Sequence, residues 1–166
     1  MTSPQQRRAR LPQVETTSIR AVYGRLTAEQ AGQVLDLWQR HRAVEPGPEA
    51  EERLRQVVCI YLDRDGIVVG VNTVYPVFLP SRAAQFLAYR LFIQPGNRTP
   101  GVMRRMTILA YQTLRDADLP DKPAGLLVRA DNSKLMRPGL VAMLERHGLE
   151  VLDDKHRDRQ VWIWPF

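Results

Sequence analysis

The sequence contains little from which a disulfide, a metal centre or a membrane span could be built. Among its 166 residues there is one cysteine, Cys59, and there are three histidines. A lone cysteine cannot close an internal disulfide, and its apolar neighbours predict a buried, unreactive thiol rather than a nucleophile. The histidines and the cysteine lie too far apart for a zinc-binding pattern. No apolar run reaches the roughly 20 residues that a helix needs to span a bilayer.

Several well-marked catalytic motifs are absent as well. The chain has no Gly-x-Ser-x-Gly nucleophile elbow, no Walker loop and no dinucleotide fingerprint. Its first residues, MTSPQQRRARLPQ, are basic but no apolar segment follows them, so they do not form a secretory signal. We therefore expect a cytoplasmic protein that holds no metal and has no membrane partner.

Positive charge is in excess, with a formal net charge of +6. Such a charge suits an anionic ligand, an acidic partner or nucleic acid. It is also explained by basic residues spread over solvated faces, and both interpretations remain open. Residues 1–16, with Arg7, Arg8 and Arg10, are expected to form a flexible basic arm. The arm either contacts phosphates of RNA or DNA or is only a solvated terminus. Residues 17–166 are expected to form one domain.

The most informative stretch runs from Phe86 to Leu114 and predicts a strand, a sharp turn and a helix. Apolar and aromatic residues fill the first part too densely for an exposed strand. Thr99 is placed to cap a helix that begins at Pro100. The open N–H groups of a first helical turn carry about half a positive unit charge. Because Arg98 adds a full charge beside them, the turn is predicted to hold a diphosphate.

This stretch resembles the cofactor motif of the GNAT superfamily, the acyl-CoA-dependent N-acetyltransferases. In that motif a strand ends near a proline, and Arg/Gln-x-x-Gly-x-Gly/Ala then opens a long helix. Here Arg98-Thr99-Pro100-Gly101 supplies Arg-x-x-Gly, whereas Met103 stands in the position of the last small residue. A second similarity lies downstream, where a strand-like GLLVRA precedes Asn132 and a helix that ends Glu145-Arg146-His147-Gly148-Leu149. The resemblance spans residues 54–166.

The resemblance implies an α/β (α+β) fold, with a mixed, mostly antiparallel sheet of about seven strands and about four flanking helices. It also implies that a splayed parallel pair of strands forms the cofactor cleft, where acetyl-CoA or another acyl-CoA binds as co-substrate. Its pantetheine arm is expected to pair with the strand from Leu91 to Gln94. The residues implied in cofactor binding are Phe92, Ile93, Gln94, Arg98, Thr99, Gly101, Val102, Met103 and Asn132. Without the resemblance, the same stretch is also explained as a core strand, turn and helix that bind no ligand.

Two helices are predicted before the first hairpin. Thr27 and Gln30 form a capping box ahead of a helix that runs to about His41, and Pro48 starts a short second helix. In the resemblance these helices form the wall of the acceptor site. His41 and Glu45 lie at the break between them and are candidates for acceptor binding. Both are also explained as ordinary surface residues.

A β-hairpin follows the second helix, because Asp65-Gly66 is a turn signal between two β-rich runs. Its second strand is predicted from Ile67 to Val77, and Pro76 and Pro80 are expected to end it. A hairpin followed by alternating helix and strand indicates a mixed sheet rather than a doubly wound parallel one.

The activity that the resemblance implies is transfer of an acetyl or other acyl group from acyl-CoA to an amine, by direct attack in a ternary complex. This reaction needs a neutral amine, an oxyanion donor and an acid for the leaving thiolate. The family often places that acid as a tyrosine four residues before the terminal glycine, where this chain has Leu144. Tyr75 and Tyr89 are the remaining candidates, although both are also explained as packing aromatics.

Two alternatives stay open beside the acyltransferase. The net charge and the arm are compatible with a GNAT-like domain that binds RNA or uses an aminoacyl-tRNA as donor. The missing tyrosine and the lack of a strand carboxylate are compatible with a catalytically silent interaction module. The sequence does not name the acceptor, a small-molecule or peptide amine, and it leaves a homodimer open. Trp162 and Trp164 share one strand face and would indicate an interaction surface if they were exposed.

Overall fold

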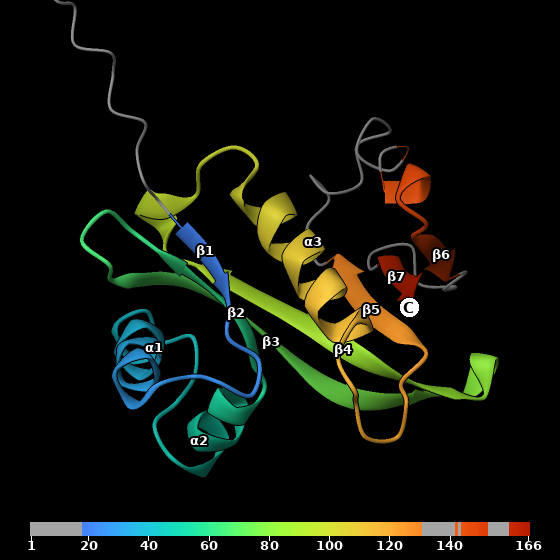
Figure 1. Cartoon of the computed structure of the whole chain (residues 1–166), viewed down its shortest axis with the longest axis horizontal. Coiled ribbons are helices and arrows are strands. Elements are labelled where there is room, and N and C mark those ends of the chain that lie inside the picture. Colours follow the sequence, from blue (N-terminus) through green and yellow to red (C-terminus); the bar gives the residue numbers. More distant parts are fainter. Residues whose placement is uncertain (1–17, 131–141, 143, 153–159) are drawn as a thin grey trace, which may run out of the picture.

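The computed structural model of the chain describes residues 18–130, 142, 144–152 and 160–166. The basic arm, residues 1–16, and Asn132 lie outside the described residues, so the predictions made for them stay predictions. In the described part, helices pack on both faces of one sheet (Figure 1). None of the helices in that part is long and apolar enough to cross a bilayer.

The described chain contains strands, α-helices and two short 3-10 helices. The strands are β1 (Ser18–Ala21), β2 (Val57–Leu62), β3 (Val68–Leu79), β4 (Ala84–Ile93), β5 (Gly125–Ala130), β6 (Glu150–Leu152) and β7 (Gln160–Pro165). The α-helices are α1 (Ala28–Arg40), α2 (Pro48–Arg55) and α3 (Val102–Arg115), and the 3-10 helices span Pro80–Arg82 and Pro95–Asn97. Residues 142 and 144–146 are also helical, where the sequence predicts a fourth helix.

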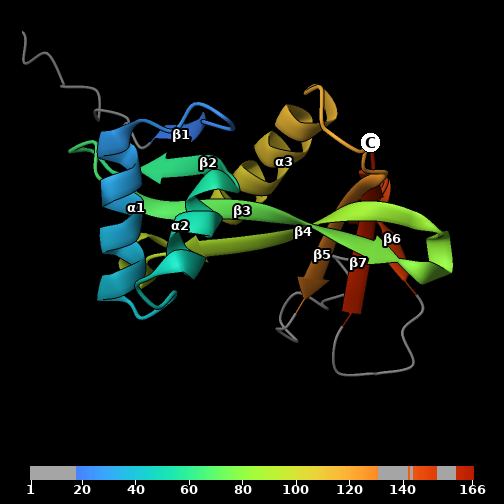
Figure 2. The ribbon, with the colours of Figure 1, turned by 90° about the horizontal axis from the view of Figure 1, so that it is seen from below.

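The strands form one seven-stranded sheet in the order β1-β2-β3-β4-β5-β7-β6. All neighbouring pairs are antiparallel except β4 and β5, which run parallel. Helix α3 covers one face of the sheet, and α1 and α2 cover the other (Figures 1 and 2). The predicted mixed, mostly antiparallel sheet with one parallel pair is therefore confirmed.

Helix α1 begins at the predicted capping box. Thr27 Oγ1 accepts a hydrogen bond from the Gln30 amide at 3.2 Å, and the Thr27 amide donates to Gln30 Oε1 at 3.1 Å. These bonds satisfy two of the amides that a helix start leaves open. Val34, Leu37 and Trp38 point into the core at helical spacing, which fixes α1 against the sheet.

Strand β3 is longer than the sequence predicts, because Pro76 lies inside it and the strand continues to Leu79. The Val74 amide donates to Gln56 O, on the side of β3 that faces β2. Because backbone groups alternate in direction along a strand, the nitrogen of Pro76, two residues on, points to the same side. Strand β2 begins only at Val57 and does not reach Pro76, so the missing N–H of Pro76 leaves no hydrogen bond of the sheet unmade. The far half of the β3–β4 hairpin extends past α2 and packs against β5 and β7 (Figure 2).

Helix α3 starts two residues later than predicted. Thr99 does not cap it and Pro100 is not its first residue; the cap is Gly101, with φ +82°, and the helix begins at Val102. A φ of this sign is left-handed backbone, which glycine adopts readily. The Val102 amide still donates to Thr99 O at 3.3 Å, so the turn before the helix is closed by the backbone instead of by a threonine side chain.

A buried asparagine ties α3 to the sheet. Asn72 is fully buried; its Oδ1 accepts from the Cys59 amide at 2.7 Å and its Nδ2 donates to Met106 O at 3.2 Å. The β2–β3 register shifts between Val57 and Cys59, and the Asn72 side chain supplies the acceptor for the Cys59 amide. Burial raises the pKa of the Cys59 thiol to about 12, and the Asn72 hydrogen bond opposes this shift. The thiol is buried, as predicted.

Candidate functional site

The parallel strands β4 and β5 separate partway along their length. They pair only at Leu87 with Leu126, Ala88 with Leu127 and Tyr89 with Val128. Strand β4 nevertheless continues to Ile93, and β5 continues to Ala130. Beyond Tyr89 the edge of β4 that faces β5 therefore has unpaired backbone groups.

A cavity of about 490 Å³ lies where the two strands separate. Side chains from both faces of the sheet line it, together with the start of α3 and the segment 144–149. The lining residues are Tyr75, Ala88, Tyr89, Arg90, Leu91, Met103, Arg104, Thr107, Ile108, Leu127, Val128, Arg129, Leu144, His147, Leu149, Trp162 and Trp164. Such a volume is typical of a small-molecule or cofactor site.

The unpaired groups of β4 can be assigned from the pattern of its hydrogen bonds. The Gln94 amide donates to Val69 O at 2.8 Å, toward β3. Alternation along the strand turns the backbone groups of Leu91 and Ile93 the other way, toward the gap. Gln94 and Phe92, both predicted cofactor residues, therefore direct their backbone groups to β3. Leu91, at the start of the Leu91–Gln94 stretch expected to pair with the pantetheine arm, offers a free N–H and C=O beside the cavity.

The first turn of α3 forms a positively polarised end of this cavity. Its opening amides have no acceptor inside the helix, and the turn contains no acidic residue. Arg98, Arg104 and Arg105 are exposed around it. Arg98 Nε donates to Ile93 O at 2.9 Å, which places the guanidinium at the end of β4 and leaves its other N–H groups for a ligand.

The remaining predicted cofactor residues lie along the same turn. Thr99 and Gly101 are exposed, whereas Val102 is fully buried and its amide donates to Thr99 O. Met103 is 42% exposed and lines the cavity without filling it. Its position, where the resemblance expects a small residue, narrows the cavity but leaves it open.

Helix α3 is held in place at both ends of the cavity. Near the start of the helix, Met106 accepts from Asn72, and Tyr89 lies in the same polar cluster. Farther along, the Tyr111 ring stacks on Trp164 with ring centroids 3.9 Å apart, and the Tyr111 hydroxyl donates to Pro165 O at 2.6 Å. These contacts fix α3 against the sheet beside the cavity.

The two candidate tyrosines have different surroundings. The Tyr89 hydroxyl lies 3.1 Å from Thr107 Oγ1 and accepts from Asn72 Nδ2 at 3.3 Å, and burial raises its pKa. The Tyr75 ring lies under the Arg90 guanidinium, with Arg90 Cζ 4.4 Å from the ring centroid. No described residue forms a hydrogen bond with the Tyr75 hydroxyl, although its side chain lines the cavity. Leu144, where the family often has a tyrosine, also lines the cavity and offers no proton.

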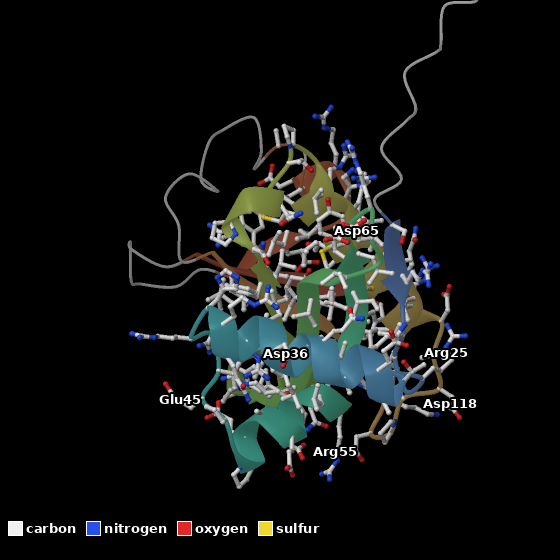
Figure 3. All side chains as sticks on the ribbon, turned by 90° about the vertical axis from the view of Figure 1, so that its left-hand side faces the viewer. Arg25, Asp36, Glu45, Arg55, Asp65 and Asp118 are labelled. Atoms are coloured by element: carbon white, nitrogen blue, oxygen red, sulfur yellow. The ribbon has the colours of Figure 1, made fainter. Side chains whose placement is uncertain are left out.

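The predicted acceptor residues lie outside the main cavity. The His41 ring is 5.6 Å from the Phe92 ring, and its Nε2 is buried without a partner among the described residues. Glu45 is exposed and lies at the edge of the molecule near α1 and α2 (Figure 3). Trp162 and Trp164 are buried, so they do not form the exposed pair that would indicate an interaction surface. No group of three or more His, Cys, Asp or Glu side chains in the described part could hold a metal ion.

Comparison with protein-family models and with curated proteins finds no match. Solved structures of low sequence identity do match. Escherichia coli YhbS, a GNAT family N-acetyltransferase solved with CoA, has a TM-score of 0.60 and 17% identity, covering 93% of this chain and 85% of its own. Arabidopsis thaliana Naa50, solved with a bisubstrate analogue, has a TM-score of 0.57 and 13% identity, covering 91% and 99%. The GNAT domain of PAT from S. lividans has a TM-score of 0.59 and 8% identity, covering 89% of each chain. The chain therefore has the GNAT fold, which confirms at the level of the fold the resemblance predicted from its sequence.

Proposed function

We propose that the chain is an acyl-CoA-dependent N-acyltransferase that moves an acetyl or other acyl group to an amine in a ternary complex. The observation that supports this most strongly is the cavity where β4 and β5 separate, directly at the positive end of α3. Structures of the same fold have been solved with acetyl-CoA, for Arabidopsis thaliana NAA60, and with CoA, for Escherichia coli YhbS.

The residues around the cavity fit acyl-CoA as a substrate. The N–H and C=O of Leu91 and the N–H of Ile93 suit the amides of a pantetheine arm, which would pair with β4 as an added strand. The Ile93 C=O already accepts from Arg98 Nε. The diphosphate would bind Arg98 and the amides of Gly101 and Met103 at the first turn of α3, whereas the Val102 amide already donates to Thr99 O. Thr99, and Asn132 outside the described residues, stay proposed contacts. Phe92 would contribute the wall of the site through its side chain.

In this reaction a bond forms between the amine nitrogen and the acyl carbon, the carbon–sulfur bond breaks, and the thiolate takes up a proton. The nitrogen loses a proton to solvent. We assign the proton donor to Tyr75, because it lines the cavity and its hydroxyl is free of described partners. A backbone N–H at the β4 edge would polarise the thioester carbonyl.

Calorimetric titration with acetyl-CoA tests the proposal, and a cavity-filling variant locates the site. We expect binding to the wild-type protein and its loss in Met103→Trp, because the larger ring fills the cavity mouth. Ile67→Trp is the matched control: Ile67 is 42% exposed, as Met103 is, but does not line the cavity. Absence of binding to wild type at millimolar acetyl-CoA would count against the proposal, as would equal binding to both variants.

A catalytically silent interaction module is the second candidate. It is favoured by Leu144, which lines the cavity without a hydroxyl, and by Tyr89, whose hydroxyl is already hydrogen-bonded. Acetyl-CoA binding without acyl transfer to any member of a broad amine panel would support it, and any transfer would exclude it. Binding of RNA or of an aminoacyl-tRNA depends on residues 1–16 and stays a prediction.

A further inference from the structure

A second, smaller cavity lies on the α1 and α2 side of the sheet. Its volume is about 170 Å³. Most of its wall is apolar, formed by Trp38, Ala43, Val44, Val71, Leu91 and Phe92. The polar exceptions are Thr73 and two arginines, Arg53 and Arg90. Two cations in an apolar cavity are unusual enough to need a reason.

Arg90 projects from β4 and is held in one position at the wall of this cavity. Its Nε donates to Thr73 Oγ1 at 3.2 Å, and its Nη2 donates to Gln56 Oε1 at 2.5 Å. The guanidinium also lies over the Tyr75 ring. No described residue accepts a hydrogen bond from Nη1, so a fixed cation retains donors for a ligand.

Arg53 projects from α2 toward the same cavity. Its side chain is 25% exposed, and its Nη2 binds Glu49 Oε1 at 2.6 Å. The Nε atom is buried and has no hydrogen-bond partner among the described residues. A buried N–H without an acceptor is unfavourable, and a ligand oxygen in the cavity would remove that cost.

The charges around this cavity are compatible with one negative charge on the ligand. Burial and, after it, the positive charge of Arg53 lower the pKa of Arg90, whereas Tyr75 and Glu49 oppose the shift. Glu49 compensates one of the two cations, and one positive charge is left. A carboxylate would neutralise it, and its two oxygens match the planar fork of a guanidinium. A dianion would bring an uncompensated negative charge into apolar surroundings.

The two cavities share part of their walls. Arg90 and Leu91 line both. The second cavity therefore adjoins the main one where β4 leaves β5. A ligand that placed a carboxylate beside Arg90 would have its other end near the place proposed for the acyl group.

We infer that the acceptor is an amine bearing a carboxylate, which Arg53 and Arg90 bind while the amine nitrogen lies in the main cavity. The role of the amine rests on the proposed acyltransferase function. Recognition of the carboxylate does not rest on that function, because the two arginines would bind the carboxylate whether or not acyl transfer follows. Free amino acids and acidic peptides both supply such a group.

Matched pairs of amines with and without a carboxylate test the inference. Glycine, β-alanine and γ-aminobutyrate are compared with their carboxamides, and the peptide Gly-Asp with Gly-Asn. Each is titrated calorimetrically into the CoA-loaded and the CoA-free protein, and each is assayed with acetyl-CoA. We expect the carboxylate member of at least one pair to bind about tenfold to a hundredfold tighter than its amide. Comparing the amino acid pairs with the peptide pair shows whether the carboxylate comes from a free amino acid or from an acidic peptide.

Arg53→Gln should abolish this preference and leave the affinity for acetyl-CoA unchanged. Arg55→Gln is the matched control on the same helix. Arg55 also pairs with a glutamate, Glu52, at 3.0 Å, but its side chain is 77% exposed and extends away from the molecule (Figure 3). We expect Arg55→Gln to keep the full preference for the carboxylate.

The inference is overturned if wild type binds every amide as tightly as its carboxylate partner, a comparison that needs no variant to fold. It is also overturned if Arg53→Gln and Arg55→Gln keep the same preference, or if no carboxylate-bearing amine binds. A carboxylate preference that depends on Arg53, without any binding of acetyl-CoA, would support the inference and contradict the proposed function.

Discussion

Two tyrosines line the main cavity, and they differ in what their hydroxyl groups contact. The Tyr89 hydroxyl is held between Thr107 and Asn72, and burial raises its pKa. Tyr75 packs its ring under Arg90 and has a hydroxyl that no described residue binds. An acid for a leaving thiolate must be free to give up its proton, so the geometry favours Tyr75.

We expect Tyr75→Phe to lower kcat for acyl transfer about a hundredfold. The affinity for acetyl-CoA should not change, because the phenyl ring still supports Arg90. Tyr89→Phe makes the same chemical change in the same cavity and is the control. It should lower the free energy of unfolding by about 1 kcal/mol and leave kcat near the wild-type value. Steady-state kinetics and urea denaturation measure both effects; an unchanged kcat in Tyr75→Phe would exclude the assignment.

For single residues, the sequence identifies candidate side chains but does not show which way each of them faces. Tyr75 and Tyr89 could be named as candidates, yet only the strand register separates a free hydroxyl from a hydrogen-bonded one. The role of Leu91 likewise depends on the fold. Its side chain is ordinary, and its backbone groups become available only because β5 leaves β4 after Tyr89. Arg53 and Arg90 lie far apart in sequence and share a cavity only in the folded chain.

At the scale of the element, the start of α3 depends on a single glycine. Gly101 has φ +82° and directly precedes the first turn that is proposed to bind the diphosphate. A Cβ at this position would meet no atom within 4 Å, so only the backbone angle disfavours a side chain there.

Gly101→Ala should therefore lower the free energy of unfolding by about 1 kcal/mol and weaken acetyl-CoA binding. The matched control is Gly32→Ala in α1, where a Cβ also meets nothing within 4 Å and the backbone is helical. Alanine there should raise the free energy of unfolding by roughly 0.5–1 kcal/mol. Urea denaturation and calorimetry distinguish the variants, and equal effects of the two substitutions on stability would contradict this account.

The elements themselves were largely predictable, because their signals are local. The capping box of α1 and the Asp-Gly hairpin act within a few residues. The error at Pro76 arose where a distant strand decides the outcome. Pro76 is tolerated in β3 because β2 does not extend beside it, and no local pattern contains that information.

At the scale of the whole molecule, the order of elements predicted the sheet, and two motifs in sequence predicted the GNAT fold. The cavity depends on features that no single motif encodes. It needs β4 and β5 to part after three residue pairs, and it needs α3 to be fixed over the gap by Asn72 at one end and Tyr111 at the other. The Met103 departure from the family motif proved compatible with an open cavity.

The same core makes the stability of the whole fold sensitive to alkaline pH. Burial raises the pKa of Cys59 from 9.0 to about 12, and burial also raises the pKa of Tyr89. The folded state thus holds these protons more tightly than the unfolded state. The stabilisation is complete below about pH 9 and is lost as the pH rises toward 12, by up to about 1.4 kcal/mol per pH unit for each group.

We expect the free energy of unfolding, measured by urea denaturation between pH 8 and pH 11, to decline above about pH 9. Cys59→Val keeps a side chain of similar size and removes the thiol, so the decline should be shallower. Adding Tyr89→Phe should flatten it further, because the second buried acid is then gone as well. The comparison uses slopes, so a constant loss of stability from repacking does not affect it. Identical slopes in wild type and Cys59→Val would mean that the thiol is not held neutral by the core, and that the packing of α3 over β2 is looser than its contacts indicate.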